Sequence, residues 1–125
     1  MLIEYMGKGF LENIIAMFKA DPSLYEFIPD MLADENIRVR LGTAALVEEL
    51  ARERPDDVKR IAPAVAELLR HEQPNLRGDA AYVLGVIKDP RSTGPLEEAL
   101  GDVNPDVREV AQEALEDIRR SNPEQ

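Results

Sequence analysis

Hydrophobic side chains recur along the chain with the period of an α-helix. In segments 36–53, 75–88 and 105–120, four positions follow the i, i+3, i+4, i+7 spacing that places side chains on one helical face. These positions are Thr43, Leu46, Val47 and Leu50; Ala80, Val83, Leu84 and Ile87; and Ala111, Ala114, Leu115 and Ile118. No segment alternates apolar and polar residues with the β-branched enrichment of a strand. The pattern therefore predicts an all-α fold with these residues in its core.

A second apolar stripe precedes each of these helices. It consists of Ile28, Met31 and Leu32, then Val65, Leu68 and Leu69, and then Leu96, Ala99 and Leu100. Pro22, Pro55 and Pro90 separate the helix pairs, because proline cannot continue a helix. A leading stripe, formed by Leu11, Ile14, Ile15 and Phe18, adds one more helix. We therefore predict helices near 2–19, 23–33, 36–53, 57–71, 75–88, 93–101 and 105–120.

The chain also repeats itself. An aliphatic residue followed by arginine opens each second helix, and the arginines Arg40, Arg77 and Arg108 are 37 and 31 residues apart. Helix pairs that recur at such a period stack side by side, because one pair cannot bury its apolar faces alone. The repeat divides the chain into a leading half-unit at 1–20, three units at 23–54, 56–88 and 91–120, and a frayed tail at 121–125.

These helix pairs resemble HEAT repeats, and in particular the short variety named after the phycobilisome-lyase subunits. The run IKDPRSTGPLEEALGDVNPDVREVAQEAL, from residue 87 to residue 115, follows that pattern most closely. The resemblance implies an α-α superhelix, a short solenoid of antiparallel helix pairs. It also implies that the second helices line a concave surface, which in this family usually binds other proteins.

The resemblance further implies a structural ladder of aspartates and arginines between adjacent units. The candidate residues are Asp34 and Arg40, His71 and Arg77, and Asp102 and Arg108, with His71 replacing the aspartate of the middle unit. An arginine near the positive end of a helix dipole needs a partner. We expect the carboxylate of the preceding turn to supply it with bidentate geometry. The substitution at His71 puts one rung of the ladder in doubt.

Some positions of the second helices point away from the predicted core. Four of them, Leu41, Tyr82, Val86 and Val110, form a mildly apolar strip among small and acidic residues. Tyrosine is favoured in interfaces, because its rigid ring carries a polar tip. The strip is therefore a candidate partner-binding surface on the concave side. The alternative is that the small residues simply pack neighbouring second helices together.

The charge balance excludes several classes of partner. The chain has 15 Lys and Arg against 25 Asp and Glu, so its net charge is −10 and its pI is about 4.6. Nucleic acids and anionic membranes are bound through concentrated basic side chains. We therefore expect neither as a partner, and a protein partner is expected to be basic. The amino terminus lacks the pattern of a signal peptide or a spanning helix, which predicts a cytoplasmic protein.

Candidate chemistry is sparse. The chain has no cysteine and one histidine, so thiolate sites and sites that need two imidazoles are excluded. His71-Glu72 is similar to the His-Glu pairs of deoxyhypusine hydroxylases, but a di-iron site needs several such pairs. We therefore expect no metal, cofactor or catalytic residue.

These observations predict a non-catalytic scaffold for protein–protein interaction. The alternative, which the resemblance to the phycobilisome-lyase repeats implies, is an accessory or catalytic subunit of a bilin lyase, an isomerase or another modifying enzyme. The amino-terminal helix has apolar residues outside its main stripe, including Met1, Leu2 and Ile3. It is therefore expected either to cap the solenoid or to mediate homo-oligomerisation.

Overall fold

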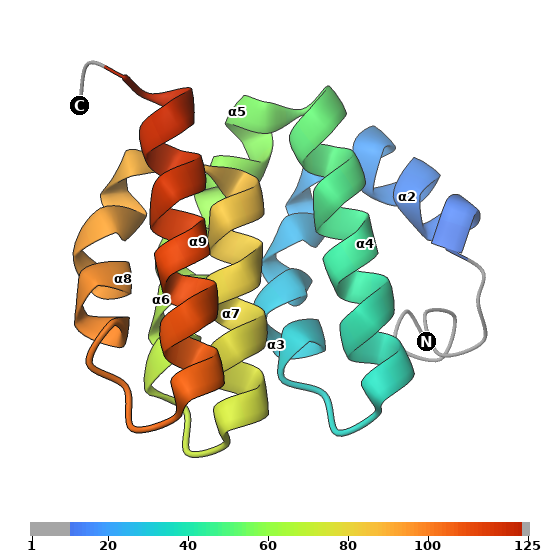
Figure 1. Cartoon of the computed structure of the whole chain (residues 1–125). Helices are drawn as coiled ribbons and strands as arrows, with labels where there is room; N and C mark the ends of the chain where they lie inside the picture. Colours follow the sequence, from blue (N-terminus) through green and yellow to red (C-terminus); the bar gives the residue numbers. More distant parts are fainter. Residues whose placement is uncertain (1–10, 124–125) are drawn as a thin grey trace.

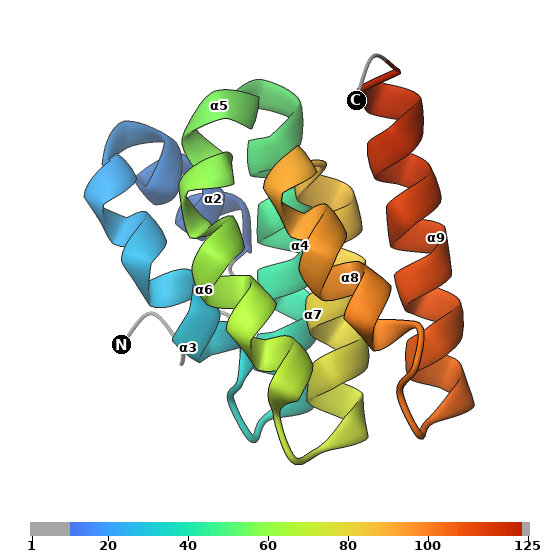
Figure 2. The same ribbon diagram turned by 90° about the vertical axis from the view of Figure 1, so that its left-hand side faces the viewer.

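The computed structural model describes residues 11–123, and every regular element in this part of the chain is helical. Three long helices, α4 (Ile37–Glu53), α7 (Pro74–Ile87) and α9 (Pro105–Ser121), lie side by side in an inner layer (Figure 1). The outer layer contains α3 (Ile28–Leu32), α6 (Ala62–Glu67) and α8 (Thr93–Ala99), as Figure 2 shows. The helix α2 (Leu11–Ala20) packs on α4 at one end. The predicted all-α solenoid of helix pairs is confirmed.

The inner helices begin at residues suited to helix starts. The Asn36 side chain accepts a hydrogen bond from the Arg38 N–H, and Asn104 accepts one from the Asp106 N–H, both at 2.8 Å. The helix α7 has no such side-chain cap and begins instead with Pro74, whose missing N–H costs nothing in a first turn. These local signals explain where the three inner helices begin.

The first two outer helices differ from the prediction, which had them continuous, whereas the third begins at the predicted residue 93. The first is divided into a 3-10 segment, η1 (Pro22–Phe27), and α3. The second consists of α5 (Pro55–Val58), η2 (Lys59–Ile61), α6 and η3 (Leu68–Arg70). In the third, η4 (Pro90–Ser92) precedes α8. Pro29 and Pro63 lie inside the first two and provide no N–H for the helical hydrogen-bond pattern, which explains their breaks.

The core lies between the two layers. All twelve inner-helix positions predicted from the periodicity are buried, and so are most of the outer ones. Leu68 and Leu100 are only half-buried. Thr43 is the one polar side chain among the twelve, and its hydroxyl donates to the Val39 carbonyl at 2.6 Å. The buried hydroxyl is therefore satisfied within its own helix.

One close approach joins two inner helices. A Cβ atom on Gly85 of α7 would lie 3.0 Å from both Cα and Cβ of Ala114 on α9. Such a contact is tighter than most Cβ contacts, so a side chain at this position would require the two helices to move slightly apart. This contact lies next to Val86 of the predicted strip and does not involve the strip residues themselves. No helix of residues 11–123 is long and apolar enough to span a membrane.

The carboxyl end of the last helix is fixed to its neighbour. The helix α7 ends at Lys88, which has a left-handed backbone with φ of 62°. The Asn122 amide donates to the carbonyls of Ile118 at 2.9 Å and Lys88 at 3.2 Å. The prediction of a frayed tail from residue 121 is therefore wrong for Ser121 and Asn122. The predicted homo-oligomer contact involves residues 1–10, which lie outside the described residues.

The backbone of Lys88 allows a simple stability prediction. Only glycine adopts a positive φ without steric cost, so Lys88→Gly should raise the free energy of unfolding by about 0.5–1 kcal/mol. Urea denaturation of the two proteins measures the difference. Lys88→Ala keeps the Cβ atom and should bring no such gain, so equal stabilisation by alanine and glycine would contradict the explanation.

Candidate functional site

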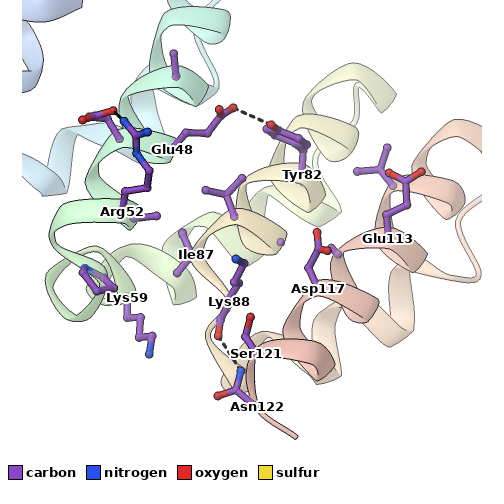
Figure 3. Close-up of a pocket in the computed structure, with 18 residues that line it drawn as sticks. Glu48, Arg52, Lys59, Tyr82, Ile87, Lys88, Glu113, Asp117, Ser121 and Asn122 are labelled. Carbon is purple, nitrogen blue, oxygen red and sulfur yellow. Dashed lines mark hydrogen bonds and ion pairs between the residues drawn. The ribbon is translucent and has the colours of Figure 1, made fainter.

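An open groove follows the exposed faces of the three inner helices. One half, with a volume of about 760 Å³, lies toward their carboxyl ends and is shown in Figure 3. The other half, about 690 Å³, lies toward their amino ends. Ala45, Glu48, Tyr82 and Val110 line both halves, so the two volumes form one continuous surface, which we name the inner groove.

A hydrogen bond crosses the middle of the inner groove. The Tyr82 hydroxyl of α7 donates to Glu48 Oε1 of α4 at 2.7 Å (Figure 3). This bond raises the pKa of Tyr82 above its usual value, because the ionised phenol could neither donate nor tolerate the nearby carboxylate. Tyr82 therefore stays neutral, with its ring 47% exposed between two helices.

The structure brings all four residues of the predicted strip to the inner groove. Leu41 lines the half at the amino ends, Val86 lines the half at the carboxyl ends, and Tyr82 and Val110 line both. Leu41 is 64% exposed although it is a large aliphatic residue.

Sequence reasoning missed several groove residues, of which two are close to Leu41 in helical spacing. Ile37, which is 59% exposed, and Glu48 also line the groove. They stand four residues before and seven residues after Leu41. The helical spacing from Leu41 could have found both of them.

The ladder has one fully formed rung between units. Arg77 donates from Nε to Asp102 Oδ2 at 2.8 Å and from Nη2 to Asp102 Oδ1 at 3.0 Å. Its Nη1 also donates to the His71 and Glu72 carbonyls of its own unit. The bonds from Arg77 hold the pKa of Asp102 below its usual range. The two side chains are 12% and 9% exposed, so water screens this pair little.

The prediction that each ladder arginine pairs with the carboxylate of its own unit is wrong. Arg40 donates to the main-chain carbonyl of Asp34 at 2.7 Å, and Arg108 donates to that of Asp102, also at 2.7 Å. The carboxylates fold back onto the next turn instead, where Asp34 accepts from the Asn36 N–H at 2.8 Å. The arginine of one unit thus reaches a carboxylate of the following unit.

The rung at the middle unit is incomplete. His71 stands where Asp102 stands in the next unit, and its Nδ1 accepts from the Gln73 N–H at 3.0 Å. It offers Arg40 no carboxylate, and Arg40 Nε is buried without a hydrogen bond, 3.5 Å from Asp79 Oδ2. Burial raises the pKa of Asp79 despite the opposing effect of Arg40. The substitute ion pair is therefore weak.

Comparison with known proteins agrees with this architecture. A family model described as HEAT repeats matches residues 26–116. The chain belongs to the HEAT-repeat family. The match does not extend to the phycobilisome-lyase variety, which stays a prediction, and no curated protein matches the chain. HEAT repeats generally mediate protein–protein interaction.

Candidate metal ligands do not cluster in the part of the HEAT units that the structure describes. Within residues 11–123, no three His, Asp or Glu side chains converge as ligands for an ion. His71 is bonded instead to the main chain of its own turn.

The weak rung of this HEAT array can be repaired. His71→Asp should give Arg40 Nε a carboxylate and raise the free energy of unfolding by about 1 kcal/mol, since an unmade buried hydrogen bond is costly. Thermal unfolding at neutral pH measures the gain. His71→Asn is the control, because it keeps an acceptor for the Gln73 N–H but adds no charge. Equal stability of the two variants would contradict this account of the rung.

Proposed function

We propose that the chain is a non-catalytic scaffold that binds a partner protein through the inner groove. The observation that carries the proposal is the concentration of exposed apolar side chains there. Among the described residues, six large hydrophobic side chains are exposed, and Ile37, Leu41 and Tyr82 line the groove. Exposed apolar surface within a concave site is typical of interfaces.

The contrast with the carboxyl-terminal helix supports this choice of surface. The exposed positions of α9 between its ends are polar or charged, including Arg108, Glu109, Gln112 and Glu116. Such a face suits the end of a repeat array in contact with water. The alternative of a bilin lyase or isomerase subunit rests on the resemblance alone, and no described residue adds to it.

The proposal is tested with one substitution in the groove and one outside it. Leu41→Glu places a charge on the groove, whereas Val103→Glu places the same charge on the turn before α9, where Val103 is 89% exposed. A partner is captured from native extract, identified by mass spectrometry and purified. Its affinity for each variant is then measured by calorimetry.

We expect Leu41→Glu to weaken binding at least about tenfold, as loss of an interface anchor does. Val103→Glu should leave the affinity unchanged. Both variants should keep the melting temperature of the parent, because both side chains are exposed. Unchanged binding by Leu41→Glu would contradict the proposed function.

A further inference from the structure

Within the described residues, the inner groove contains carboxylates that form no ion pair with a basic side chain. Glu48 on α4 and Asp106 and Glu113 on α9 line the groove, and none of them forms an ion pair within residues 11–123. Glu48 accepts a hydrogen bond from the Tyr82 hydroxyl, and no other side chain of residues 11–123 bonds to it. These side chains therefore provide negative charge that remains available to a partner.

The carboxylates stand on both walls of the groove. The helix α7 lies between α4 and α9 (Figure 1), so Glu48 faces the groove from one side and Asp106 and Glu113 from the other. Tyr82 and Val86 of α7 form the surface between them. A chain bound along α7 would thus meet apolar side chains beneath it and carboxylates on either side.

The basic side chains of the groove do not cancel this charge. Arg40 is bound to carbonyls and lies beside Asp79 in the ladder, and Arg52 pairs with Glu49. Lys59 and Lys88 line only the half at the carboxyl ends of the helices. The half at the amino ends is lined by three acidic residues and by Arg40 alone among the basic ones.

Resting on the proposed function, we propose that the inner groove binds a basic segment of a partner protein that carries a large apolar side chain flanked by lysines or arginines. The apolar side chain contacts Ile37, Leu41 and Val110 in the half at the amino ends. The flanking basic side chains extend along Tyr82 and bring their charges to the carboxylates of the two walls.

The chemistry of Lys and Arg fits both parts of this surface. Their aliphatic stems cover apolar side chains while their charged ends stay at a polar rim. A guanidinium also forms two hydrogen bonds to one carboxylate, such as Glu113. An acidic or phosphorylated segment would meet like charge on both walls, so the groove selects against it.

The experiment uses a displayed library of random 12-residue peptides selected on the full chain. We expect the enriched peptides to contain at least one large apolar residue and a net positive charge. Synthetic copies are then measured by fluorescence anisotropy at two salt concentrations. Added salt should weaken their binding, because exposed charges are screened.

Two matched variants decide whether the groove carboxylates are responsible. The first combines Glu48→Gln, Asp106→Asn and Glu113→Gln. The second combines Glu26→Gln, Glu67→Gln and Glu97→Gln, which removes the same charge from exposed positions of the outer layer. The first should weaken peptide binding at least about tenfold, and the second should change it less than about twofold. Thermal melts establish that both variants fold.

Three results would overturn the inference: no enriched peptide, enriched peptides without positive charge, or equal effects of the two variants. None of these would by itself overturn the proposed function. The proposed function is tested by whether Leu41→Glu weakens binding of the natural partner. Failure of the inference and failure of the proposed function are therefore seen in separate experiments.

Discussion

Replacing Leu84 with alanine is expected to lower the free energy of unfolding by about 2–5 kcal/mol, because the cavity adds to the lost burial of the side chain. Leu84 is fully buried in α7, the inner helix that packs against both α4 and α9. In a repeat array each unit is stabilised by its neighbours. A cavity in α7 therefore weakens the units on both sides of it.

Denaturation in guanidinium chloride, followed by circular dichroism, measures the loss. Val103→Ala is the control, since Val103 is 89% exposed and its truncation should change stability by less than about 0.5 kcal/mol. A loss below about 1 kcal/mol for Leu84→Ala would mean that α4 and α9 close around the cavity. That outcome would contradict the expectation that the packing around α7 cannot close the cavity.

The second large effect is expected at the complete rung of the ladder. Asp102→Asn removes the charge that Arg77 contacts through two hydrogen bonds, and the arginine is then left in a poorly solvated position. We expect the melting temperature at pH 7 to fall by about 5–10 °C. Glu98→Gln breaks the exposed ion pair with Arg70, and it should have no measurable effect.

The same variant should change the response to acid. Arg77 lowers the pKa of Asp102 in the folded protein, so the pair stabilises the fold above the ordinary carboxyl pKa of 3.8. This contribution is lost as the pH falls from about 3.8 through the lower folded value. The difference between the parent and Asp102→Asn should therefore shrink below pH 3.8. A difference that stays constant down to pH 2 would contradict the role of this ion pair.

The inner layer could be predicted from the sequence because its signals are local. Helical spacing placed Leu46, Leu84 and Leu115 in the core, and all three are buried. The breaks in the outer helices were missed although Pro29 and Pro63 are visible in the sequence. The apolar periodicity of 23–33 and 57–71 runs past both prolines, so spacing alone predicted continuous helices there.

The candidate site was only partly predictable, because it depends on distances between units. Periodicity identified Leu41 and Tyr82 as exposed, but it did not pair Tyr82 with Glu48, 34 residues away. The partner of each ladder arginine was assigned to its own turn for the same reason. The close approach of Gly85 to Ala114 likewise depends on the separation of two helices, which sequence spacing does not contain.

The rung between Arg77 and Asp102 also gives the array a direction. At this rung the middle unit provides the arginine, and the unit that follows it provides the turn aspartate that accepts. Among the described residues, the Arg108 side chain donates only to the Asp102 carbonyl. A copy of residues 89–120 joined after α9 would present its own aspartate to Arg108. Lengthening the array at this end would follow the direction of the rung, and the exposed polar positions of α9, such as Glu109, Gln112 and Glu116, would first have to become apolar so that a further unit could pack there.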